Sequence, residues 1–149
     1  MIKKDLYKAL GMEQYCWGDC FMIDHEAAAN KTIELIDKIC IAEKLNPLAK
    51  QWNEISFDAC NALLENAFNF DLAYSSSELM PKEKAIYYKD YVMTNFNASE
   101  TRCFTNWQKN PWTGRKGGSW LPITDHTFDI AIVLVDSTKL IFTYFISED

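Results

Sequence analysis

The sequence of 149 residues predicts an α+β fold in which N-terminal helices pack on a C-terminal antiparallel sheet that ends in a β-hairpin. Two observations favour this class. Residues 26–96 carry apolar side chains at the spacings of three and four that amphipathic helices show, whereas residues 128–146 form two apolar runs rich in β-branched and aromatic residues. The helical patterns precede the strand patterns and do not alternate with them, which is typical of α+β domains.

The C-terminal hairpin is the most strongly patterned part of the chain. In residues 128–135 both alternating faces are apolar except at Asp129, so this strand should be covered on both faces or lie centrally in its sheet. A short polar break precedes a second strand over residues 140–146, and a connection of that length allows only antiparallel pairing. A two-residue loop would place Asp136 opposite Lys139.

The helices are expected ahead of this hairpin, over residues 2–10, about 26–45, about 57–68 and 82–96. Ser56 is a suitable N-cap for the third, and Pro81 suits the first turn of the fourth. Pro47 should end the second, because proline disfavours helical conformation in the residue before it. Residues 12–23 show no clear period, and we expect them to be irregular.

The region between the helices and the hairpin changes in character. Residues 102–107 can form a strand, and residues 119–123 a short strand or extended segment. Between them, glycine and proline punctuate a loop over residues 110–118.

Length and composition place the chain among globular proteins with one domain spanning residues 1–149. The hydrophobic fraction of 48% argues against disorder, and no apolar run is long enough to span a membrane. The five cysteines are odd in number and irregularly spaced, and the first residues lack a secretory signal. We therefore expect a cytoplasmic protein with reduced thiols.

The charge distribution predicts a protein partner and argues against nucleic acid binding. The net charge of −6 argues against a general nucleic-acid binder, because such proteins usually carry a basic face. Residues 51–79 contain acids and no lysine or arginine, and grouped carboxylates can attract a basic partner. The candidate binding acids of this segment are Glu54, Asp58, Glu65 and Asp71. A solvated face that serves only solubility is the alternative interpretation.

A second candidate surface lies around the loop after residue 107. Three tryptophans flank basic side chains there, and tryptophan and arginine dominate binding hot spots because they bury much area with few rotatable bonds. We expect Trp112 and Arg115 to contact a partner. For Trp107 and Trp120 we favour the alternative that they are core residues of their strands, and Trp112 can equally be a residue that merely covers the sheet.

Catalytic and metal-binding patterns are weak in this sequence. Cys16, Cys20 and His25 do not supply the four ligands of a structural zinc site, and we expect neither a metal nor a cofactor. The alternative to a binding protein is a small enzyme in which His126 and Asp125 or Asp129 perform acid–base catalysis. The competing interpretation is that this segment merely makes a turn into the next strand.

Residues 120–129 (WLPITDHTFD), followed by a hairpin with an acidic end, resemble small bacterial proteins. Some of these are immunity proteins against the toxins of contact-dependent growth inhibition. The resemblance implies a cytosolic, acidic protein that binds and blocks one toxin domain, such as a basic nuclease domain, and it carries over no individual site residue. The leading hypothesis is therefore an immunity protein that occludes a cognate toxin. An interaction module without inhibitory action is a third hypothesis.

Overall fold

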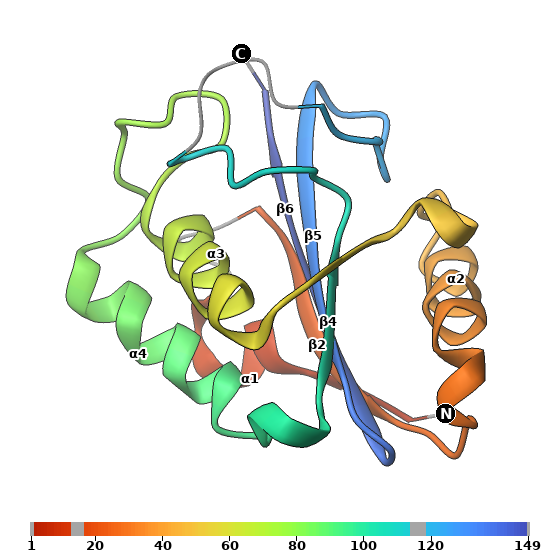
Figure 1. Ribbon diagram of the computed structural model, residues 1–149. Helices are drawn as coiled ribbons and strands as arrows, with labels where there is room; N and C mark the ends of the chain where they lie inside the picture. Colours follow the sequence, from red (N-terminus) through yellow and green to blue (C-terminus); the bar gives the residue numbers. More distant parts are fainter. Residues whose placement is uncertain (1, 13–16, 114–118, 149) are drawn as a thin grey trace.

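The computed structural model describes residues 2–12, 17–113 and 119–148. Over these residues the chain forms four α-helices and a six-stranded antiparallel sheet with the strand order β1-β2-β6-β5-β4-β3 (Figure 1). The strands are β1 (Lys3–Asp5), β2 (Gly18–Asp24), β3 (Asn53–Ile55), β4 (Arg102–Thr105), β5 (Phe128–Val135) and β6 (Lys139–Ser147). The helices are α1 (Leu6–Leu10), α2 (Thr32–Ala42), α3 (Phe57–Asn69) and α4 (Lys82–Met93). The predicted α+β class is confirmed.

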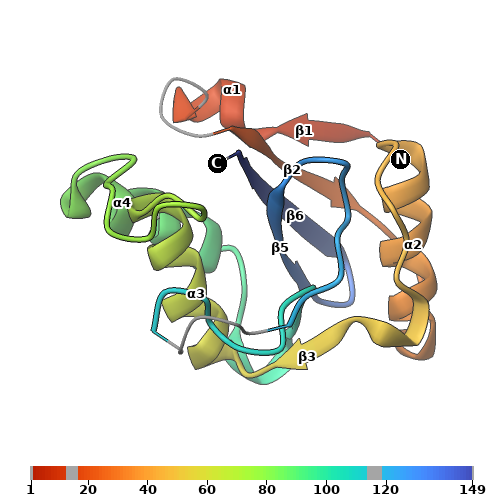
Figure 2. The ribbon, with the colours of Figure 1, turned by 90° about the horizontal axis from the view of Figure 1, so that it is seen from above.

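The sheet is the middle of three layers. Helices α3 and α4 lie on one face and α2 lies on the other, as the view from above shows (Figure 2). Two hydrophobic clusters correspond to these two interfaces. Leu6 and Tyr7 of α1 belong to the cluster beneath α3 and α4.

Strand β5 is buried on both faces, as its apolar pattern predicts. One set of its side chains packs beneath α3 and α4, namely Ile130, Ile132 and Leu134. The alternate set packs beneath α2, namely Ala131, Val133 and Val135. The strand pairs with β6 on one side and β4 on the other, so it also lies centrally in the sheet.

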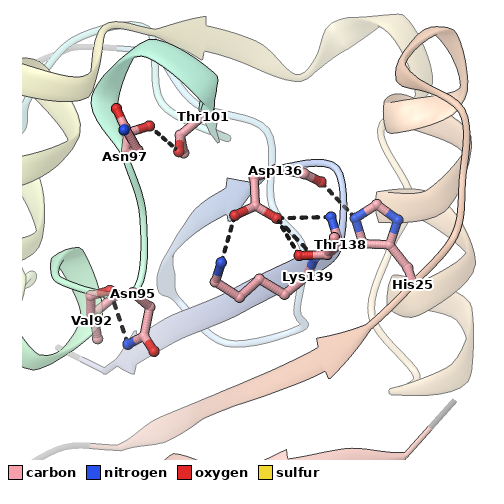
Figure 3. Close-up of polar contacts among 8 residues, drawn as sticks. All are labelled: His25, Val92, Asn95, Asn97, Thr101, Asp136, Thr138 and Lys139. Atoms are coloured by element: carbon pink, nitrogen blue, oxygen red, sulfur yellow. Dashed lines mark hydrogen bonds and ion pairs between the residues drawn. The ribbon is translucent and has the colours of Figure 1, made fainter.

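The predicted register of the β5–β6 hairpin is also confirmed. Val135 pairs with Leu140, and the backbone N–H of Asp136 donates to the carbonyl of Lys139 at 3.0 Å. The Asp136 carboxylate accepts hydrogen bonds from the backbone N–H groups of Thr138 and Lys139, each at 2.9 Å, and pairs with the Lys139 ammonium at 2.6 Å (Figure 3). One carboxylate therefore holds the whole turn.

The tip of this turn is also fastened to the end of β2. The Nε2–H group of His25 donates to the carbonyl of Asp136 at 2.8 Å (Figure 3). The Nδ1 atom of the same ring accepts from the backbone N–H of Ala27 at 3.1 Å. These two bonds together require the neutral imidazole with its proton on Nε2. The backbone N–H of His25 donates to the carbonyl of Thr138, which completes the contact.

The prediction that helices come first and the sheet last is wrong in part, because β1 and β2 precede most helices and β3 lies between two of them. Residues 12–23 were predicted to be irregular, yet β2 pairs with β6 along its whole length. Gly18 has a φ of 129°, and a Cβ atom there would lie 1.9 Å from the carbonyl oxygen of Tyr144. Phe21 stacks on Phe142 with ring centroids 5.6 Å apart. These interactions with a distant strand leave no period in the local sequence.

The first predicted helix is divided between two elements. Residues 3–5 join the edge of the sheet as β1, and only residues 6–10 are helical. Asp5 makes the transition, because its carboxylate accepts from the backbone N–H of Lys8 and so caps α1.

Helix α2 is shorter than predicted at both ends. It begins at Thr32, after a turn of 3₁₀ helix over Ala29–Lys31. It ends at Ala42, because Lys44 adopts a positive φ of 60° and the backbone N–H of Leu45 bonds back to the carbonyl of Cys40 at 2.7 Å. The chain therefore leaves the helix before it reaches Pro47.

Helix α3 follows its prediction closely, whereas α4 is shorter than predicted. The Ser56 hydroxyl caps α3 by accepting from the backbone N–H of Ala59 at 3.0 Å. Helix α4 begins after Pro81 and ends at Met93, three residues before the predicted end at residue 96. Within the described residues, no helix has both the length and the apolar character that crossing a bilayer requires.

The Asp136 turn generates a pH-dependent stability prediction. Burial raises the pKa of Asp136, but the hydrogen bonds from Lys139 and Thr138 outweigh this effect, so its pKa lies below the ordinary value. A lowered folded-state pKa stabilises the protein above the unfolded-state pKa of about 3.9, and this contribution is lost as the pH falls through the folded-state value. Asp136→Ala should lower the free energy of unfolding by about 1–3 kcal/mol at pH 7.

The measurement is urea unfolding of both proteins from pH 7 down to pH 3. The difference between them should shrink below about pH 4. Ser137→Ala at the exposed tip of the same turn is the control and should stay within about 0.5 kcal/mol of the parent protein. A difference that stays constant with pH would contradict the assigned role of the ionised carboxylate.

Candidate functional site

A groove of about 370 Å³ opens at the end of the sheet where β6 finishes. The loop after α3, the loop after β4 and the end of β6 meet at this end of the molecule (Figure 1). Aromatic side chains of Trp17, Tyr74 and Trp112 line the groove, together with the carboxylates of Asp71 and Glu148. The groove thus combines an apolar lining with negative charge.

The loop after β4 places Trp112 in the groove. Its backbone N–H donates to Oδ1 of Asn110 at 2.8 Å, and the Asn110 amide donates to Asn66 of α3 at 2.9 Å. The indole Nε1–H of Trp112 donates to the backbone carbonyl of Asp71 at 3.1 Å. Trp112 and Asp71, which were nominated from two separate stretches of sequence, therefore come together.

The loop after α3 is closed around the Asp71 side chain. One carboxylate oxygen accepts from the Ser147 hydroxyl at 2.9 Å, and the other accepts from the backbone N–H of Tyr74 at 2.8 Å. The backbone N–H of Asp71 donates to the carbonyl of Ser77 at 2.9 Å. This loop presents the Tyr74 ring to solvent with 57% of its surface exposed.

Trp17, just before β2, and Glu148, just after β6, complete the groove. The backbone carbonyl of Trp17 accepts from the N–H of Ile146 at 3.0 Å, while 68% of the Trp17 surface stays exposed. Glu148 accepts hydrogen bonds from the hydroxyl and N–H of Thr127 and pairs with Nδ1 of His126 at 2.7 Å. The hydrogen bond from Thr127, and to a smaller extent the one from His126, lowers the pKa of Glu148. This carboxylate is therefore ionised at neutral pH.

The other predicted acids do not join the groove. Glu54 forms two hydrogen bonds with Arg102, at 2.9 and 3.0 Å, and these bonds lower the pKa of Glu54. Glu65 lies 3.6 Å from the buried ammonium of Lys89. Asp58 is exposed in the first turn of α3. Glu54 is thus paired with an arginine, whereas Glu65 shares the Lys89 ammonium with Asp90, which lies 2.8 Å from it.

The tryptophans divide between core and groove. Trp107 is buried, and its ring stacks on that of Trp120 at 5.2 Å and an angle of 4°. The interpretation as a core residue therefore fits Trp107, whereas Trp120 and Trp112 are both partly buried against the core and Trp112 lines the groove. Arg115, the other loop candidate, lies outside the described residues.

Asp129 organises the segment that was considered for acid–base chemistry. Its carboxylate is fully buried and accepts from the Asn106 amide at 2.8 Å, the Ile123 N–H at 3.2 Å and the hydroxyl and N–H of Thr124. Burial raises the pKa of Asp129 despite these hydrogen bonds. Its oxygens therefore hold the chain segment that enters β5.

His126 and Asp125 lie at a different hollow from Trp112. They are exposed and line a depression of about 280 Å³, together with Glu43 and Tyr144. Ile146 lines both this depression and the groove, and His126 of the depression pairs with Glu148 of the groove. Trp112 and His126 thus line different hollows of the described structure.

The cysteines within the described residues are buried thiols. Burial raises the pKa of Cys40 to about 12, and a hydrogen bond between Cys60 and Cys103 inside the core raises the pKa of Cys60. A protonated, inaccessible thiol is a poor nucleophile. In the part of the chain that the structure describes, no three His, Cys, Asp or Glu side chains are grouped so that they could hold a metal ion.

Comparisons of this chain with protein-family models, with curated proteins and with solved structures found no match. The site must therefore be judged on its own geometry. Sequence reasoning missed Trp17, Tyr74 and Glu148 as groove residues. Each lies in a segment without a regular apolar period. The signals that could have found them are the acidic chain end for Glu148 and the aromatic residue type for Trp17 and Tyr74.

The Asp129 network generates a second prediction. Asp129→Ala should lower the free energy of unfolding by about 1–3 kcal/mol for each buried donor left unsatisfied, because Asn106, Ile123 and Thr124 would lose their acceptor. Chemical unfolding monitored by circular dichroism measures this loss. Asp125→Ala, at an exposed neighbouring carboxylate, should change stability by less than about 0.5 kcal/mol. Equal stability of the two variants would show that Asp129 has no such structural role.

Proposed function

We propose that this protein is an immunity protein that binds and blocks a cognate toxin domain, and that the groove belongs to its binding surface. The observation that carries the proposal is the meeting of Asp71 and Trp112 at one groove. Asp71 belongs to the acidic segment and Trp112 to the aromatic loop, and the sequence predicts partner binding for both. Because the two residues are in contact, the segment and the loop form one continuous surface.

The chemistry of the groove supports a protein partner. Partly exposed aromatic side chains are the usual anchors of protein interfaces, because they bury a large area at a small cost in side-chain entropy. Trp17 and Tyr74 are the exposed aromatics that line the groove. Among the described lining residues the charged side chains are the acids Asp71 and Glu148, which favour a basic partner.

The proposed mechanism is occlusion of a basic cleft. Carboxylates of the immunity protein would occupy positions that substrate phosphates take in a nuclease-like toxin, while the aromatic anchors supply the buried area. Asp71 and Glu148, which line the groove, contribute most to this field, whereas Asp58 lies in the first turn of α3, at the other end of that helix. Glu54 and Glu65 contribute less, because Arg102 and Lys89 offset their charges.

Binding should depend on the groove and not on the paired acids. Trp17→Ala should weaken partner binding by about tenfold or more, because hot-spot aromatics contribute more than about 1.4 kcal/mol each. Asp71→Asn should weaken partner binding more at low salt than at high salt, because salt screens charge attraction. Glu54→Gln is the matched control at an acid already paired with Arg102 and should leave the affinity within about twofold.

The experiment starts with affinity capture of the tagged protein from its source lysate at low and at high salt, with identification of partners by mass spectrometry. The captured protein is then purified, and its toxic or enzymatic activity is titrated with the parent protein and the three variants. Stoichiometric silencing by the parent and by Glu54→Gln, with loss in Trp17→Ala, supports the proposal. A captured partner whose activity the added protein leaves unchanged contradicts it.

A further inference from the structure

The groove is lined by aromatic side chains and by two carboxylates, those of Asp71 and Glu148. No lysine or arginine is among its described lining residues. The exposed aromatic side chains of Trp17 and Tyr74 lie at this groove. Phe70, Leu72 and Phe145 extend its apolar lining. A groove lined by apolar and aromatic side chains together with a few polar groups is typical of a binding site.

The two carboxylates at the groove retain capacity to accept hydrogen bonds. The oxygens of Asp71 accept from Ser147 and from the N–H of Tyr74, which are neutral donors, and each oxygen has a second lone pair. Glu148 is exposed, and its described partners are Thr127 and His126. Neither carboxylate is paired with a lysine or an arginine among the described residues.

We propose that the groove binds a single arginine side chain of the protein partner, stacked on its aromatic lining and hydrogen-bonded to Asp71 and Glu148. This proposal names the ligand of the surface proposed above and rests on that function for the identity of the partner as a protein. The volume of about 370 Å³ lies at the lower end of ligand sites and suits one large side chain.

The chemistry distinguishes arginine from other side chains. A purely apolar side chain would cover Asp71 without supplying a donor, and uncompensated burial of a carboxylate is unfavourable. A lysine ammonium is strongly hydrated and bonds as a point charge. The planar guanidinium stacks on aromatic faces and donates in a fork to carboxylates at the same time, so it matches both features of the groove.

The test uses N-acetyl-arginine amide as the probe and N-acetyl-citrulline amide as its neutral, nearly isosteric control. Binding is followed by NMR of the tryptophan indole N–H signals, with Trp17 and Trp112 assigned from Trp→Phe variants. We expect saturable shifts of these two indoles with a dissociation constant in the millimolar range, which is typical of a ligand of this size. The citrulline probe should bind about tenfold or more weakly, because it lacks the charge.

Variants and a second probe complete the test. Asp71→Asn should weaken arginine binding by about tenfold and leave the weak citrulline binding unchanged, whereas Glu54→Gln should alter neither. N-acetyl-lysine amide should bind more weakly than the arginine probe. Equal binding of the arginine and citrulline probes would overturn the inference. So would shifts confined to other tryptophans, or an arginine titration that does not saturate by roughly 100 mM probe.

The outcomes for the probe and for the partner are separable. A partner whose binding requires Trp17, in a protein that ignores the arginine probe, would remove the arginine inference and keep the proposed function. Binding of the probe in a protein whose captured partner remains active would keep the arginine site and remove the immunity function.

Discussion

The structure depends on one constraint, namely that the central strands β5 and β6 are apolar on both faces. Water must be excluded from each face, because every exposed apolar side chain there would forfeit its burial free energy. One helical layer cannot do this, so α2 covers one face while α3 and α4 cover the other. The order of elements along the chain matters less than this requirement. Strands β1 and β2 come from the N-terminal part of the chain, yet they extend the same sheet beside β6.

How much of the fold the sequence predicts depends on whether the determining contacts are local. The hairpin register at Asp136 and Lys139 and the cap of α3 at Ser56 follow from neighbouring residues, and both are confirmed. Strand β2 depends instead on pairing with the far end of the chain and on the close approach of Gly18 to Tyr144. No local period encodes such a contact, which is why this strand was missed.

The candidate site shows the same division between residue type and neighbourhood. Composition was sufficient to nominate Asp71 and Trp112, because acids and tryptophan have binding chemistry wherever they are exposed. It could not show that Arg102 offsets Glu54, since that pair joins β3 to β4 across the sheet. Likewise Asp129, which had looked like a candidate for proton transfer, proves to be a buried acceptor for the segment ahead of its own strand.

The two outer strands have a consequence for behaviour at high concentration. An open sheet exposes unpaired backbone groups along each outer strand, and these can recruit further chains into aggregates. Here both outer strands, β1 and β3, are only three residues long. They also carry exposed charges, Lys3 and Lys4 on one and Glu54 on the other. Shortness and charge together make these two outer strands poor templates for self-association, although the central strands of the same sheet are long and apolar.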